Sequence, residues 1–124
     1  MLNFNSILLS TENLEKLVEF YKKVFEKDPE MSDENYVGFV VGSAFFGLGS
    51  HDKIKGKNNN PDRILFNFET KDVKGEFERI KKLGTEVVKE PYTMEGYEGF
   101  WIATLADPDG NYFQLVTPWE DDKK

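Results

Sequence analysis

The sequence predicts an α+β protein built from two copies of a βαβββ module. Three observations lead to this prediction. An amphipathic helical pattern follows a short apolar run twice, the two helix starts are offset by 59 residues, and further strand-like runs follow each helix. Since neither module can bury a sheet face alone, we expect residues 1–124 to form a single domain, with module one at 1–50, a linker at 51–61 and module two at 62–124.

The first module begins with an apolar run at residues 4–9, which predicts a strand. The next apolar residues follow the helical period of i, i+3, i+4 and i+7. Asn13 stands where its side chain can cap this helix, and Pro29 is expected to stop it. Two further strands are predicted at residues 36–41 and 44–48, joined by a tight turn at Gly42. The helical stripe consists of Leu14, Leu17, Val18, Tyr21, Val24 and Phe25.

The second module repeats this order. Residues 63–68 predict a strand, and Asp72 is expected to cap a helix whose apolar stripe starts at Val73 and continues through Phe77, Ile80 and Leu83. Gly84 follows as a left-handed C-terminal cap. Three more strands are predicted at residues 85–89, 100–105 and 111–116.

Composition excludes several classes of function. The chain has 23 acidic and 16 basic residues and a formal charge of −7, so its average surface field repels a nucleic-acid backbone. Its longest apolar stretch, residues 39–49, is far shorter than the roughly 20 residues of a membrane-spanning helix. There is no cysteine, which excludes disulfides and thiolate chemistry. No secretory signal is visible in the sequence, and we expect a cytoplasmic protein.

The stretch ADPDGNYFQLV at residues 106–116 is typical of a β-hairpin turn, since Pro108 presets φ and Gly110 accepts a positive φ. Together with LEKLVEFYKKVF in the first helix and LGTEVV after the second, it resembles the vicinal oxygen chelate superfamily, which includes glyoxalases, bleomycin-resistance proteins and dioxygenases. The resemblance covers nearly the whole chain. It implies that the sheets curl into a half-barrel with helices on the outer face, around a small-molecule cleft, usually in a homodimer.

In metal-dependent members of that superfamily, the resemblance places ligands on the first strand of each module and on the last strand. The matching positions here are Ser6, Leu65 and Gln114. One hydroxyl and one neutral amide are too few donors for a divalent first-row metal. We therefore expect no metal and no cofactor. The sole histidine, His51, lies in the linker and is interpreted as incidental.

Strand alternation predicts which side chains line the cleft instead. Ile7, Leu9, Ile64, Phe66, Phe68, Phe113 and Leu115 form apolar sets expected to pack beneath the helices. The opposite, concave face receives the other side chains, and the aromatic segment at residues 92–101 is interpreted either as a mobile flap or as an ordinary strand pair. The predicted ligand-binding residues are Ser6, Leu8, Arg63, Leu65, Asn67, Trp101, Tyr112 and Gln114.

Three functions are compatible with such a cleft. The favoured hypothesis is a metal-free protein that binds a neutral polar small molecule, for sequestration or sensing. The second is a lyase or isomerase of the same superfamily, with Glu69 or Glu98 as a candidate base and with either no metal or an unorthodox metal site. The third is an interaction module whose cleft is filled by its own side chains.

Overall fold

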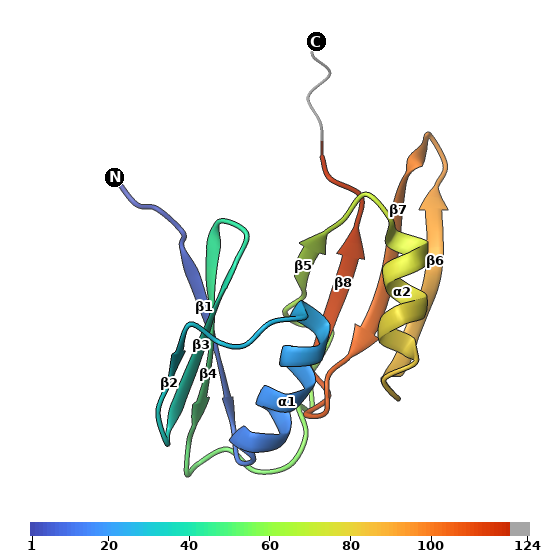
Figure 1. Cartoon of the computed structure of the whole chain (residues 1–124). Coiled ribbons are helices and arrows are strands. Elements are labelled where there is room, and N and C mark those ends of the chain that lie inside the picture. The colour runs from blue at the N-terminus through green and yellow to red at the C-terminus, as the bar shows by residue number, and fades with distance from the viewer. Residues whose placement is uncertain (120–124) are drawn as a thin grey trace. The chain divides into compact units, whose positions relative to one another are not determined.

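The computed structural model describes residues 1–119 and divides into two compact units, Met1–Lys57 and Asn58–Lys124 (Figure 1). The boundary between the units falls inside the predicted linker. The expectation that the two modules form one domain stays a prediction.

The first unit is a four-stranded mixed sheet with one helix against it. The sheet order is β1-β4-β3-β2, in which β1 runs parallel to β4 and the other neighbours are antiparallel. The elements are β1 (Ser6–Thr11), α1 (Leu14–Phe25), β2 (Met31–Ser32), β3 (Tyr36–Val41) and β4 (Ala44–Ser50).

The second unit has the same topology. Its order is β5-β8-β7-β6, again with the first strand parallel to the last and the other pairs antiparallel. The elements are β5 (Phe66–Glu69), α2 (Val73–Lys81), β6 (Glu86–Met94), β7 (Tyr97–Ala106) and β8 (Tyr112–Val116). The repeated βαβββ order confirms the predicted α+β fold class.

The helix caps form as the sequence predicts. The Asn13 side chain accepts from the Lys16 N–H at 3.2 Å, and the Asp72 side chain accepts from the Gly75 N–H at 3.0 Å. Gly84 has a φ of 90°, the left-handed conformation that favours glycine. The first helix ends earlier than Pro29 requires, because Glu26 adopts a left-handed φ of 58° and its N–H donates to the carbonyl of Lys22.

Each unit has its own apolar core beneath its helix. In the first, Tyr21 of α1 is fully buried and its ring lies 4.9 Å from that of Phe46 in β4, in edge-to-face contact. In the second, Phe77 and Ile80 of α2 are buried, and Phe113 of β8 has no exposed surface. These cores fix which face of each sheet is turned away from its helix.

Several predicted boundaries need correction. Strand β5 begins only at Phe66, so Ile64 lies outside it and is 67% exposed instead of packing beneath the helix. Residues 92–101 form the turn end of the hairpin between β6 and β7, with Gly96 at its turn, which favours the strand-pair interpretation over the flap. The short strand β2 was not predicted.

Candidate functional site

The two faces of the second sheet differ in chemistry. Phe66, Phe68 and Phe113 share one face and contact one another, with ring centroids 5.7 to 6.3 Å apart. Side chains alternate along a strand, so Asn67 and Gln114 lie on the other face, which is turned away from α2. The predicted apolar and polar sets of these two strands are therefore placed as expected.

Four polar residues stand side by side across this helix-free face. Asn67 of β5 is the register partner of Gln114 in β8, Gln114 is the partner of Thr104 in β7, and Thr104 is the partner of Lys89 in β6. Register partners in neighbouring strands share a face. We call these four residues the polar row: Asn67, Gln114, Thr104 and Lys89.

The middle of the polar row is internally bonded. The Gln114 side-chain nitrogen donates to the Thr104 hydroxyl at 3.2 Å, and Thr104 is only 5% exposed. This bond ties the Gln114 side chain to its neighbour in β7. Asn67 and Lys89 at the two ends are exposed. The Lys89 ammonium lies 5.2 Å from the centre of the Tyr92 ring. The exposed ends of the row therefore carry an amide and an ammonium group.

The corresponding row of the first sheet is apolar. Leu8 pairs with Gly47, Gly47 with Gly38, and Gly38 with Met31. The tip of the Phe45 ring occupies the place where a side chain at Gly38 would stand, and a Cβ at Gly47 would meet the hydroxyl of a tyrosine on β3. Aromatic side chains thus cover the glycines on this face, beside the 58% exposed Leu8.

The remaining predicted site residues lie in both units. Ser6 is exposed on the same face as Leu8. Arg63 and Leu65 precede β5, and Leu65 is 41% exposed. Tyr112 is half-buried at the start of β8. The ring of Trp101 lies 3.8 Å from the ammonium of a lysine on α2, so Trp101 is on the helix side and does not join the polar row.

Sequence reasoning missed two members of the row, Thr104 and Lys89. The hairpin turn at residues 107–110 could have predicted the position of Thr104. Strand pairing that starts with Ala106 opposite Tyr112 brings Thr104 opposite Gln114. No such signal existed for Lys89, since β6 shifts register on both sides of it.

The residues at the expected metal positions do not suit a metal ion. They present a hydroxyl at Ser6, a hydrocarbon at Leu65 and an amide at Gln114 whose nitrogen already donates to Thr104. Within residues 1–119, no three His, Cys, Asp or Glu side chains gather into a group that could hold a metal. Divalent first-row metals bind imidazole, carboxylate and thiolate ligands, and this donor set does not fit them.

The fold defines a protein of two βαβββ modules, with a polar row on the helix-free face of the second sheet and an apolar row at the equivalent positions of the first. Residues 3–115 match the family described as the Glyoxalase/Bleomycin resistance protein/Dioxygenase superfamily, and the chain belongs to it. This confirms the predicted resemblance. In the described part of the chain, no helix has both the length and the apolar character needed to span a membrane.

The curated relatives of the chain include a metallothiol transferase. It is 26% identical over 115 residues to the metallothiol transferase FosB of Shouchella clausii, covering 91% of this chain and 78% of that protein. It resembles the fold of the fosfomycin resistance protein FosX from Listeria monocytogenes at 22% identity, with a TM-score of 0.74 and coverage of 96% and 95%. It also resembles that of a glyoxalase-related enzyme from Fulvimarina pelagi at 14% identity, with a TM-score of 0.79 and coverage of 100% and 96%.

Proposed function

We propose that the chain binds a small polar molecule through the polar row of its second sheet, without a metal, and acts by sequestration or sensing. The observation that carries this proposal is the continuous line of Asn67, Gln114, Thr104 and Lys89 on a sheet face that its own helix does not cover. Neighbouring side chains on the same face add the remaining contacts.

The row supplies complementary hydrogen-bonding groups on a rigid base. Asn67 offers both a donor and an acceptor, the Gln114 carbonyl oxygen accepts, and Lys89 donates. Each bond to a ligand contributes about 0.5–1.5 kcal/mol in net terms. Beside the row, Ile102 and Val116 are register partners and form an apolar strip. A small molecule with amide or hydroxyl groups and a short apolar edge matches this surface.

Thermal shift with a panel of metabolites and antibiotics tests the proposal, with fosfomycin included because a structural neighbour is named as a fosfomycin resistance protein. A ligand at 100 times its dissociation constant raises the unfolding free energy by about 2.7 kcal/mol. For any hit, Lys89→Met and Thr104→Val are expected to weaken binding roughly 10-fold. Lys82→Met is the matched control, because Lys82 lies just after α2. Row variants that bind as well as the control contradict the proposal.

The metal-free part of the proposal has its own test. Calorimetry of the purified chain with zinc, manganese and nickel ions is expected to show no stoichiometric binding tighter than about micromolar. Gln114→Leu removes the amide and serves as the comparison. Tight binding of one ion per chain by the wild type, lost in Gln114→Leu, would establish a metal site at the row.

A second candidate is an enzyme, a lyase or isomerase in which Glu69 acts as a general base. It is favoured by the position of Glu69, which lies two residues after Asn67 on the same exposed face of β5. Substrate turnover abolished by Glu69→Gln in a normally folded protein would support this candidate. Turnover unaffected by that change would remove the role.

We also propose a homodimer in the cytoplasm, as the superfamily resemblance and the absence of cysteine suggest. Sedimentation at micromolar concentration is expected to give twice the 14.4 kDa mass of the chain. A monomer at that concentration contradicts the dimer.

A further inference from the structure

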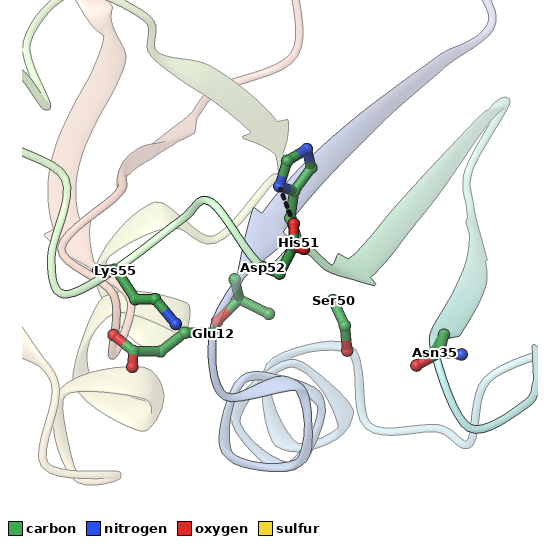
Figure 2. A pocket seen from close by; sticks show the side chains of 7 residues that line it. Glu12, Asn35, Ser50, His51, Asp52 and Lys55 are labelled. Atoms are coloured by element: carbon green, nitrogen blue, oxygen red, sulfur yellow. Dashed lines mark ion pairs between the residues drawn. The ribbon is translucent and has the colours of Figure 1, made fainter.

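A polar pocket lies wholly within the first unit, at the end of the sheet where the parallel strands β1 and β4 terminate (Figure 2). Its volume is about 460 Å³, within the usual range for small-molecule sites. It belongs to neither the polar row nor the predicted cleft residues. The lining residues are Thr11, Glu12, Asn35, Ser50, His51, Asp52 and Lys55.

The pocket is held open by main-chain bonds to the ends of the strands. The His51 N–H donates to the carbonyl of Thr11 at 3.1 Å, and the Ser50 N–H donates to the carbonyl of Asn35 at 3.0 Å. The loop after β4 then returns to the strand end, where the Gly56 N–H donates to the Glu12 carboxylate. These bonds hold a loop around the pocket and leave the second carboxylate oxygen of Glu12 available.

The imidazole of His51 is oriented within this loop. Its Nδ1 accepts from the Lys53 N–H at 3.1 Å, so the ring proton of the neutral imidazole is on Nε2. The Asp52 carboxylate lies 3.8 Å from the same Nδ1, the contact dashed in Figure 2. That distance is too long for a hydrogen bond, and the amide already occupies the nitrogen. His51 therefore offers an Nε2–H donor.

The lining determines the class of ligand. All seven residues are polar, so binding depends on hydrogen bonds and charge. With His51 neutral, the two carboxylates of Glu12 and Asp52 outnumber the single ammonium of Lys55, which leaves one excess negative charge. Free anions are repelled, and an ammonium group gains a charge-assisted bond. The Ser50 hydroxyl and the Asn35 amide can bond to hydroxyl groups of the same molecule.

We propose that this pocket is a binding site for a small hydroxylated amine, a molecule with one ammonium group and several hydroxyls, of the aminosugar type. The ammonium binds the Glu12 carboxylate, and the exposed Asp52 carboxylate adds to the negative charge around it. The hydroxyls bind Ser50, Asn35 and the Nε2–H of His51. This site is independent of the polar row, and binding at one of them does not require the other.

The single histidine makes the test direct, because its ring resonances in an NMR spectrum of the full chain belong to His51 alone. The chain is titrated with glucosamine, glucose and glucose 6-phosphate. Glucosamine is expected to shift the His51 resonances saturably, with a dissociation constant of about 1 mM. Glucose, which lacks the ammonium, is expected to bind roughly 10-fold more weakly, and glucose 6-phosphate not at all. No saturable shift with glucosamine, or equal shifts with all three, overturns the proposal.

Two variants locate the effect. Glu12→Gln keeps an acceptor for the Gly56 N–H while removing the charge, and is expected to weaken glucosamine binding roughly 10-fold. Glu19→Gln is the matched control, because it removes an exposed carboxylate from α1 outside the pocket and leaves binding unchanged. If the Gly56 amide resonance shows that the loop has opened in Glu12→Gln, Ser50→Ala decides instead. Unchanged glucosamine binding in the variant that decides, Glu12→Gln or Ser50→Ala, contradicts the site. Ligand binding by Lys89→Met tests the polar row alone and does not affect this conclusion.

Discussion

The hairpin turn between β7 and β8 depends on one buried carboxylate. Asp107 is 4% exposed, and its side chain accepts from the Asp109 N–H at 2.9 Å, the Asn111 N–H at 3.0 Å and the Asn111 side-chain nitrogen at 3.0 Å. Because β8 starts at Tyr112, directly after this turn, these bonds also fix where Gln114 stands. Replacing Asp107 by Ala leaves three donors without their acceptor.

The expected loss follows from these bonds. A hydrogen bond to a charged group contributes about 1.5–3 kcal/mol, but water entering the vacated space replaces part of it. We expect Asp107→Ala to lower the free energy of unfolding by about 3 kcal/mol, which corresponds to roughly 10 °C in melting temperature for a chain of this size. Asp107→Asn keeps one acceptor oxygen but turns an NH2 group toward Asn111, and is expected to cost about 1.5 kcal/mol.

Urea unfolding monitored by circular dichroism measures these differences, with a constant slope indicating that the transition remains comparable among variants. Asp109→Ala is the matched control, since Asp109 lies in the same turn but its hydrogen bonds are made by its main chain. The expected order of destabilisation is Asp107→Ala, then Asp107→Asn, then Asp109→Ala. If Asp107→Ala and Asp109→Ala agree within about 1 kcal/mol, the buried carboxylate does not organise the turn.

Two further predictions concern the first unit. The hydrogen bond from Lys27 and that from the Val40 N–H hold the pKa of Glu30 below its ordinary value of 4.5, although desolvation opposes them. The stability from this lowered pKa is therefore present above pH 4.5 and is lost as the pH falls through the folded pKa. Melting curves of wild type and Glu30→Gln should differ most near neutral pH and converge in acid, and a constant difference would count against this assignment. Gly38→Ala places a Cβ against the tip of the Phe45 ring, and the displaced ring should cost about 1 kcal/mol in urea unfolding; a stabilised variant would refute the contact.

The helices and their caps could be predicted because their signals are local. The apolar stripe that begins at Leu14 and ends at Phe25 coincides with the bounds of α1, and both predicted N-cap side chains make their bonds. Each of these features depends on residues within about one turn of one another. The repeat of the same local signals then predicted the two-module fold.

Strand limits were less predictable because a partner strand sets them. Ile64 and Leu65 are as apolar as the residues that follow, yet pairing with β8 begins at Phe66, opposite Phe113. In β6, the register shifts around Pro91 break the alternation that identifies a strand. The sequence alone therefore could not extend β6 and β7 through the segment interpreted as a possible flap.

The same distinction applies to the candidate site. Gln114 and Asn67 were placed on the face opposite the helices by alternation within single strands, which the sequence contains. Their neighbours Thr104 and Lys89 depend on registers between strands, and the register at Lys89 is reached only through irregular pairing. Trp101 falls on the helix side for the same reason, since the face of β7 was not fixed by any local pattern.

The two modules share one topology but differ in the side chains on the helix-free faces of their sheets. Each sheet has a row of four residues at equivalent positions, starting at Leu8 in the first and at Asn67 in the second. The first row continues through two paired glycines to a methionine, whereas the second is polar throughout. A ligand held by hydrogen bonds gains little from the first row, because aromatic rings cover its glycines. The hydrogen-bonding side chains of these two rows therefore belong to the second module. If the proposed function holds, substitutions in the polar row should affect binding more than those at the equivalent positions of the first sheet.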